Sequence, residues 1–419
     1  MGFTIIEVLP MVDVETAAQL PALRLKRNED RRLNAGHLWI FSNEVDTQQT
    51  ALNKFKPGDY ARVLAHNDRA MGLAYVNPQS LICARLLSTW SIPDAAWLAA
   101  RIRIALKLRE RLYAKPFYRL IFGESDGLPG LIVDRYGAIC VVQIGTAGME
   151  RLKEQIQHAL IDVVHCEALL FKNDSASREL EGLPSYVETG HGHIGDLVPV
   201  EEDGLEFQVP LASGQKTGWF FDQAANRSAL PRYMAPGARV LDVFSYVGAW
   251  GVRALHAGAR EVLCVDSSAA ALELAASNAA GNDRHDNDRR GKLMTLKGDA
   301  FDVLEELAAK GERFDVVVID PPAFAKRKKD VPKALAAYKR LNQLAMQLIG
   351  DGILVSCSCS FHISAEDLQD AIAKAARSAQ KHLQILQMGG QAADHPVHPA
   401  IPETRYLKAY FCRVSDGLK

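Results

Sequence analysis

The sequence contains no C-x-x-C pair, and its 7 cysteines are scattered through 419 residues. Paired cysteines at that spacing mark structural zinc sites, and an even, regularly spaced set marks a disulfide framework. An odd set, often inside apolar stretches, is instead typical of a reducing compartment. We therefore expect a cytoplasmic protein without structural zinc, and we expect no metal in its functional site.

Long apolar runs and a strong net charge are also absent. No stretch approaches the roughly 20 apolar residues that a membrane-spanning helix needs, so no membrane partner is expected. The formal net charge is −1, so any nucleic-acid surface must be a local basic patch. A content of 48% hydrophobic and 24% charged residues is typical of globular proteins. The length predicts two or three domains.

The sequence does contain a strand–turn–helix–strand unit at residues 239–268. The turn carries Gly248, and the second strand ends at Asp266, which lies 24 positions after Asp242. That separation is close to the spacing of about 20 residues in nucleotide-binding βαβ units. Because ligands of parallel sheets bind beyond the carboxyl ends of the strands, the Asp266 carboxylate can accept both hydroxyls of a ribose.

The turn differs from the G-x-G-x-x-G pattern of dinucleotide sites. Phe244 stands where the first glycine would be, which argues against a pyrophosphate and favours a nucleoside ligand without phosphates. S-adenosylmethionine (SAM) is such a ligand. An NAD-dependent oxidoreductase is the alternative that this difference argues against.

Several other predicted strand ends and loops of residues 201–419 should meet at the same rim of the sheet. We expect SAM to lie over the glycine turn, with its ribose on the carboxylate of the second strand. The residues expected to hold SAM are Lys216, Thr217, Phe220, Asp222, Asp242, Phe244, Gly248, Asp266, Asp299 and Ala300.

A buried strand at residues 314–320 leads into an Asp-Pro-Pro-Ala-Phe loop. Two prolines stiffen this loop, and its aromatic ring can stack on a base. Enzymes that modify an atom within a base must extrude that base into such a pocket, and the basic run 326–329 can hold phosphates. The expected substrate contacts are Pro321, Pro322, Phe324, Lys326 and Arg327.

The first half of the chain predicts two smaller modules. Residues 21–90 suggest a β-barrel with basic residues at 24–32, after an extension at residues 1–20. Residues 91–200 suggest an α+β module with a helix at 95–113. Helical spacing predicts that one face of this helix is buried and that its basic side chains form a surface. The buried face comprises Leu98, Ile102, Ala105, Leu108 and Leu112, and the basic residues are Arg101, Arg103, Lys107, Arg109 and Arg111.

Six motifs make the chain resemble the ribosomal RNA large subunit methyltransferase I family: residues 36–42, 216–223, 242–248, 320–324, 357–360 and 394–399. The resemblance covers nearly everything after residue 20. It implies a PUA domain at 21–90, a central α+β domain at 91–200, and a Rossmann-like class I SAM methyltransferase domain of α/β class at 201–419. It also implies methylation of cytosine C5 in 23S rRNA, either as free RNA or in a large-subunit assembly intermediate. The sequence leaves open whether the protein forms a homodimer.

This chemistry needs a nucleophile, because C5 of cytosine is too weakly nucleophilic to take a methyl group unaided. A thiolate that adds to C6 activates C5. Strand alternation places Cys357 and Cys359 on one face and cannot choose between them. Depth favours Cys359, which lies nearer the rim, since a buried cysteine is usually inert. The resemblance agrees, because related enzymes carry the cysteine seven positions after a strand-initiating glycine, as Cys359 follows Gly352. Asp320 is expected to hold the flipped cytosine.

One difference and two alternatives accompany the resemblance. Many cytosine-C5 RNA methyltransferases have a second cysteine directly after the Pro-Pro pair, where this chain has Ala323, so another base must remove the C5 proton. Guanine methylation is one alternative, but it has no use for a nucleophilic cysteine. A catalytically inactive PUA-type RNA-binding protein is the other, and the presence of Asp266, Asp320 and Cys359 argues against it.

Overall fold

The structure is a computed structural model that describes residues 19–87, 92–282 and 291–417. Most of the predicted extension 1–20 therefore lies outside the described residues, and so does most of the charged segment 282–290, for which the sequence predicts a solvated loop. The chain divides into two compact units. The first comprises the described residues of Met1–Ala114, together with Arg119–Ile194 and His398–Pro402, and the second comprises Lys115–Tyr118, Gly195–Val397 and Glu403–Lys419.

The first unit contains a five-stranded sheet in the order β1-β3-β4-β5-β2. Its elements are β1 Ala22–Arg24, α2 Arg31–Asn34, β2 Trp39–Phe41, β3 Asp59–Leu64, β4 Ala70–Val76 and β5 Ile82–Leu86. Alternate apolar side chains of the strands, such as Leu23 and Val63, form one buried core. The sequence predicts strands at 23–25, 60–64, 71–76 and 84–87, and β1, β3, β4 and β5 overlap these ranges. The short β2 was not predicted, because three residues are too few to show alternation.

The first unit also contains a second five-stranded sheet, in the order β10-β9-β8-β7-β6. Its elements are α3 Ala95–Leu112, β6 Phe117–Phe122, β7 Leu131–Tyr136, β8 Ile139–Ile144, α4 Ala147–Glu150, α5 Lys153–Val164, β9 Ala168–Asn173 and β10 Tyr186–His191. In this part of the chain the sequence predicts a hairpin of residues 131–136 and 139–144 and a helix at 149–164, and the hairpin is β7–β8. The single helix predicted at 149–164 is instead two helices, because Thr146 caps the earlier four-residue α4.

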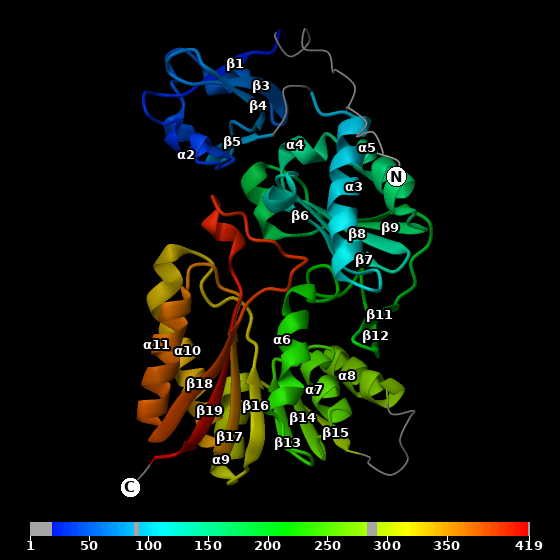
Figure 1. Cartoon of the computed structure of the whole chain (residues 1–419), viewed down its shortest axis with the longest axis vertical. Coiled ribbons are helices and arrows are strands. Elements are labelled where there is room, and N and C mark those ends of the chain that lie inside the picture. The colour runs from blue at the N-terminus through cyan, green and yellow to red at the C-terminus, as the bar shows by residue number, and fades with distance from the viewer. Residues whose placement is uncertain (1–18, 88–91, 283–290, 418–419) are drawn as a thin grey trace, which may run out of the picture. The chain divides into compact units, whose positions relative to one another are not determined.

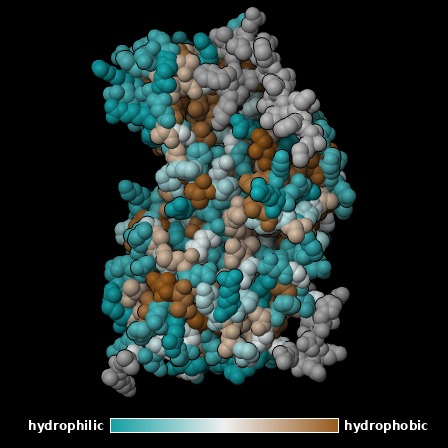
Figure 2. All heavy atoms as spheres, in the orientation of Figure 1, coloured by the Kyte–Doolittle hydropathy of each residue, from teal (hydrophilic) through white to brown (hydrophobic). Residues whose placement is uncertain are grey.

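Helix α3 turns a different face to the core from the one predicted. The first three residues of the expected apolar face are buried, whereas Leu108 and Leu112 are 41% and 48% exposed. Figure 2 accordingly shows hydrophobic atoms at the surface on the face where Figure 1 shows α3. The buried face continues through Arg109, whose guanidinium donates two hydrogen bonds to the Asp126 carboxylate at 2.6 and 2.7 Å. The prediction was wrong because hydrophobic periodicity cannot reveal a buried arginine that is fully paired.

The second unit contains a seven-stranded sheet in the order β15-β14-β13-β16-β17-β19-β18. Its strands are β13 Arg239–Val243, β14 Glu261–Asp266, β15 Lys292–Lys297, β16 Phe314–Ile319, β17 Ile349–Ser358, β18 Lys381–Gly389 and β19 Lys408–Asp416, preceded by the hairpin β11 Val198–Glu202 and β12 Leu205–Val209. Strands β13 to β17 run parallel, and β19 is antiparallel to both β17 and β18. Strand β18 was not predicted, because most of its side chains are exposed and show no clean alternation.

Helices cover both faces of this sheet (Figure 1). Helices α9 Ala300–Ala309, α10 Val331–Gln347 and α11 Ala365–Ser378 pack against one face, and α6 Ala224–Ala229, α7 Ala249–His256 and α8 Ala269–Asn282 pack against the other. The central strands are therefore buried on both sides, which explains the continuous β-branched run of β16. The carboxyl ends of the parallel strands meet at one rim. Within the described residues, no helix combines the length and apolar character that a bilayer crossing requires.

Candidate active site

The turn that follows β13 has an unusual backbone. Phe244 and Tyr246 have φ angles of 64° and 48°, in the left-handed region that side chains other than glycine rarely adopt. Gly248 has φ of 84°, and a Cβ at this position would lie 2.8 Å from the Cβ of Ala275 on α8. The turn therefore requires glycine there and packs closely against α8.

The Asp266 carboxylate at the end of β14 is held by this turn. Its Oδ2 accepts the N–H of Tyr246 at 2.9 Å, and its Oδ1 accepts the N–H of Ser268 at 2.9 Å. Each carboxylate oxygen can accept a further hydrogen bond, and the residue is half-buried rather than enclosed. The arrangement fits a ligand with two adjacent hydroxyl groups, such as the ribose of a nucleoside.

Asp242 lies beneath the turn. It is 0% exposed, and its Oδ2 accepts the N–H of Gly251 at 2.9 Å. Burial raises the pKa of this carboxyl to about 7. Asp242 thus shapes the start of α7 and offers no surface to a ligand. Thr217, another residue expected to hold the cofactor, is likewise 0% exposed.

The loop before α6 is attached to the glycine turn through Tyr246. The Tyr246 hydroxyl donates to the carbonyl oxygen of Gly218 at 3.1 Å, and its ring meets the Phe220 ring edge-on with centroids 5.6 Å apart. The Lys216 Nζ lies 4.7 Å from the Phe220 centroid. The structure therefore places Lys216 and Phe220 beside the glycine turn, as expected for one site.

The Asp320 carboxylate, directly after β16, is held from two sides. Its Oδ1 accepts a hydrogen bond from Gln223 Nε2 at 2.8 Å, and its Oδ2 accepts one from Trp250 Nε1 at 3.2 Å. Burial raises the pKa of Asp320 to about 6, although the hydrogen bonds and the nearby Arg227 lower it. A carboxyl with a pKa near neutrality can either accept or donate a hydrogen bond to a base edge.

Contacts on the far side of Gln223 fix its orientation. The Asn226 Nδ2 donates to Gln223 Oε1 at 2.7 Å, which leaves the Gln223 amide nitrogen to face Asp320. The neighbouring Asp222 is 5% exposed, and its Oδ2 accepts the Tyr406 hydroxyl at 2.6 Å. The chain before β19 therefore supports the loop that positions Asp320.

Cys359 follows the last residue of β17 and lies beside the Asp-Pro-Pro loop. Its Sγ is 3.8 Å from the carbonyl oxygen of Pro321. Cys359 is half-buried, whereas the other six cysteines, all within the described residues, are buried. The predicted difference in depth from Cys357, which is 0% exposed, is confirmed. Burial raises the pKa of the Cys359 thiol, while nearby Lys216 lowers it.

The aromatic ring of the Asp-Pro-Pro loop packs partly against the protein. Phe324 is half-buried, with its ring centroid 4.9 Å from that of Tyr338 and 6.5 Å from that of Phe301. Pro321 is buried and Pro322 is exposed. The side chains from Lys326 to Lys329 are all exposed. Of the residues expected to contact substrate, the exposed ones are thus Pro322 and the cations.

Sequence reasoning missed four side chains that build this site: Gln223, Tyr246, Trp250 and Tyr406. Two of them, Gln223 and Tyr246, stand inside motifs that the sequence singled out, so their position was a usable signal. Trp250 and Tyr406 reach the site through tertiary contacts across 70 and 184 positions. No periodicity or spacing in the sequence indicates such contacts.

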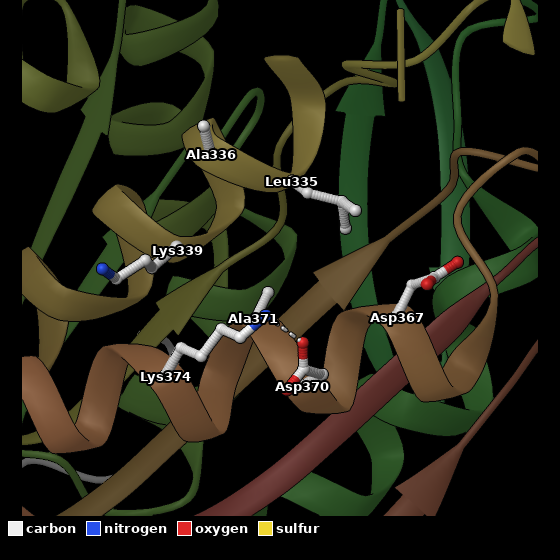
Figure 3. A pocket seen from close by; sticks show the side chains of 7 residues that line it. All are labelled: Leu335, Ala336, Lys339, Asp367, Asp370, Ala371 and Lys374. Carbon is white, nitrogen blue, oxygen red and sulfur yellow. Dashed lines mark ion pairs between the residues drawn. The ribbon is translucent and has the colours of Figure 1, made fainter. Parts of the chain in front are cut away.

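A groove of about 200 Å³ lies elsewhere in the second unit, between α10 and α11 (Figure 3). Its lining residues are Leu335, Ala336, Lys339, Asp367, Asp370, Ala371 and Lys374. Lys374 and Asp370 form an ion pair at 2.6 Å across one helical turn. The groove contains none of the residues predicted for the site, and we assign it no ligand.

Family models and known proteins resemble this chain over nearly its whole length. A PUA-like domain model matches residues 23–89, and an S-adenosylmethionine-dependent methyltransferase model matches residues 170–411. Ribosomal RNA large subunit methyltransferase I of Shewanella frigidimarina is 36% identical over 404 residues, covering 94% of this chain and 99% of that protein. Its counterpart in Salmonella arizonae is 35% identical over 409 residues, covering 95% and 99%.

Two solved structures share the fold. One, a methyltransferase complexed with SAH, has a TM-score of 0.79 at 19% identity and covers 94% of this chain and 100% of its own. The other, described as a SAM-dependent methyltransferase from Streptococcus mutans, has a TM-score of 0.78 at 20% identity, with coverage of 94% and 100%. Together with the family models, they confirm the predicted fold class.

Proposed function

The chain belongs to the ribosomal RNA large subunit methyltransferase I family of SAM-dependent enzymes, and we propose that it methylates C5 of a cytosine in 23S ribosomal RNA. One observation carries the choice of cytosine C5. The half-buried Cys359 thiol lies 3.8 Å from the Pro321 carbonyl oxygen, in the loop that begins with Asp320. A thiol beside a base-binding loop suits attack on C6 of a pyrimidine, whereas guanine methylation needs no nucleophile.

When bound, SAM supplies a methyl group on a sulfonium centre. The residues proposed to hold it are those beside the glycine turn. Asp266 accepts the ribose hydroxyls, Phe244 and Gly248 form the floor, and Asp299 with Ala300 flank the adenine. Lys216 and Phe220 close the methionine side. The buried Asp242, Thr217 and Asp222 act by supporting the turn and the loop rather than by contact.

The residues of the chain perform the remaining steps on the base. The Cys359 thiolate forms a bond to C6, and the electron pair that this releases makes C5 nucleophilic. After C5 has taken the methyl group, a base removes the C5 proton, the C5–C6 double bond re-forms and the thiolate leaves. Asp320, with a pKa of about 6, holds the N3–N4 edge of the cytosine.

We propose that the RNA is positioned by the first unit. The PUA-like match at residues 23–89 supports this, as do the exposed cations Arg103 and Lys107 on α3. We also propose domain boundaries at 21–90, 91–200 and 201–419. We propose that the protein acts in the cytoplasm, either on free 23S rRNA or on an assembly intermediate of the large subunit.

The function is tested by nucleoside mass spectrometry of 23S rRNA from a deletion strain. We expect one 5-methylcytidine to disappear, to return with the wild-type gene and to stay absent with Cys359→Ala. Loss of a methylguanosine instead would select the guanine alternative. An unchanged nucleoside profile would favour an inactive RNA-binding protein.

A further inference from the structure

Lys408, the first residue of β19, is a buried lysine to which the proposed reaction gives no role. It is 8% exposed and lies opposite Ser358 of β17 in the sheet register. Its Nζ donates hydrogen bonds to two backbone carbonyl oxygens, of Ser360 at 2.6 Å and of Tyr406 at 2.8 Å. Within the described chain no carboxylate forms an ion pair with it. Buried lysines are uncommon unless paired, and burial lowers the pKa of Lys408 to about 8.

The contacts of Lys408 fix the backbone that carries the proposed nucleophile. Ser360 follows Cys359 directly and its carbonyl oxygen is held by the ammonium group. The Ser360 Oγ accepts the N–H of Ala325 in the Asp-Pro-Pro loop at 3.3 Å and lies 3.3 Å from the Tyr338 hydroxyl. The chain beside the thiol is therefore clamped between the start of β19 and the substrate loop.

Ionisable groups from several elements face the Cys359 thiol or the Lys408 ammonium group. They are Asp222 before α6, Lys216 in the preceding loop, Asp320 after β16, Tyr338 on α10, Cys357 on β17 and Asp367 on α11. Burial raises the pKa values of Tyr338 and Cys357, so both stay neutral at pH 7. Asp222 and Asp320 disfavour the Cys359 thiolate and Lys216 favours it, while Cys359 in turn favours the charged form of Lys408.

The two lysines differ in how firmly they are held. Lys216 is exposed, so water and salt screen its charge. Lys408 is buried and anchored by two hydrogen bonds, and a buried charge is screened much less. The thiolate is the form of cysteine that attacks, and burial opposes that form in Cys359. A fixed buried cation near the thiol offsets this effect of burial, because it favours the negatively charged form.

We propose that Lys408 is a positioning residue for the nucleophile: its ammonium group stabilises the Cys359 thiolate, and its carbonyl contacts fix the strand end that carries the thiol. The inference rests on the proposed function, because it takes Cys359 to be the nucleophile. The coupling between the two side chains can nevertheless be measured without RNA.

The experiment measures alkylation of Cys359 by iodoacetamide against pH in the intact protein, with peptide mapping by mass spectrometry. The thiolate sulfur displaces iodide, so the rate follows the thiolate fraction. Because the other six cysteines are buried, they should react slowly, and the measured alkylation reports on Cys359. Lys408→Met removes the charge and retains a long side chain, and should slow alkylation at pH 7 by roughly tenfold and move the profile to higher pH.

Three further variants separate charge from packing. Lys408→Arg retains the cation and should recover most of the rate. Lys216→Met removes the exposed cation that also lowers the pKa of the thiol and should slow alkylation as well, but this slowing should fade at high salt because an exposed charge is screened. Lys408→Gln keeps a donor for the carbonyl oxygens, and it replaces the methionine variant if that variant does not fold.

A wild-type alkylation profile in folded Lys408→Met or Lys408→Gln protein, with SAM affinity unchanged, overturns the proposal. Equal slowing in Lys408→Met and Lys408→Arg overturns its electrostatic part, since packing alone would then explain the effect. If alkylation of the Lys408 variants shifts as predicted but the wild-type protein forms no covalent adduct with RNA, the result contradicts the nucleophile assignment and not the role of Lys408. Failure of the Lys408 proposal and failure of the proposed function are therefore distinguishable.

Discussion

The indole N–H of Trp250 donates to the carboxylate of Asp320 across 3.2 Å. Trp250 stands on the helix that follows the glycine turn, and Asp320 opens the loop proposed to hold the base. Together with the Gln223 contact, this hydrogen bond connects the part of the site proposed to hold SAM with the part proposed to hold RNA. Substitution of either residue should therefore affect both SAM binding and RNA binding.

The cofactor assignment predicts a specific loss. Asp266→Ala removes the acceptor for the ribose hydroxyls and should weaken SAM binding by about 1.5–3 kcal/mol, the range for hydrogen bonds to charged groups. Glu273→Ala, which removes an exposed carboxylate on α8, is the matched control and should bind SAM normally. Isothermal calorimetry gives both affinities. Equal affinities for Asp266→Ala and wild type would show that the ribose lies elsewhere.

The nucleophile assignment predicts different outcomes for two neighbouring cysteines. Cys359→Ala should abolish methylation while SAM still binds, whereas Cys357→Ala should keep substantial activity. RNA containing 5-fluorocytidine should form a stable covalent adduct with wild-type protein, because fluorine cannot leave as a proton does. Peptide mapping locates the adduct. An adduct on Cys357, or none with active enzyme, would refute the assignment.

The RNA-binding proposal makes a prediction about salt. Arg103 and Lys107 are exposed on α3, and reversing both charges to Glu should weaken RNA binding and reduce the slope of log K against log salt by roughly 1–2. Lys310→Glu, at the exposed cation that directly follows α9, serves as control. Filter binding at several salt concentrations measures the slopes. An unaltered slope would exclude this surface, and SAM affinity should stay constant throughout.

Asp242 predicts how stability depends on pH. Burial raises its pKa from 3.8 to about 7 in the folded protein, so the folded state keeps a proton that the unfolded chain loses near pH 4. The contribution to stability is full below about pH 4 and is lost as pH rises through 7. Asp242→Asn removes this titration, and the fall in unfolding free energy across the window should shrink by on the order of 3 kcal/mol.

Urea unfolding of Asp242→Asn and wild type at pH 5 and pH 8 measures this difference. Asp299→Asn, at an exposed carboxylate that caps α9, controls for a change of charge alone. If Asp242→Asn and wild type lose the same free energy between the two pH values, Asp242 does not titrate in this range.

Local features of this protein were predictable from its sequence, and long-range contacts were not. The strand–turn–helix unit around Gly248 lies where expected. The sequence also predicts that Ser364, with Asp367 three residues later, caps a helix, and the structure has this capping box. Both features depend on neighbours in the chain. Arg109 could not be foreseen as a core residue, since its burial depends on Asp126. The contacts of Tyr406 with Asp222 and of Lys408 with Ser360 likewise depend on where the chain around the start of β19 packs.

The left-handed backbone at Phe244 and Tyr246 has a consequence for engineering this enzyme toward heat resistance. Each such residue costs roughly 1–2 kcal/mol relative to an ordinary conformation, so glycine at either position would relieve the backbone. Tyr246→Gly would also delete the hydroxyl bonded to Gly218 and the ring that meets Phe220. A screen for thermostability should therefore favour substitutions at this turn that a screen for activity rejects. We expect the two screens to disagree at this turn before they disagree elsewhere.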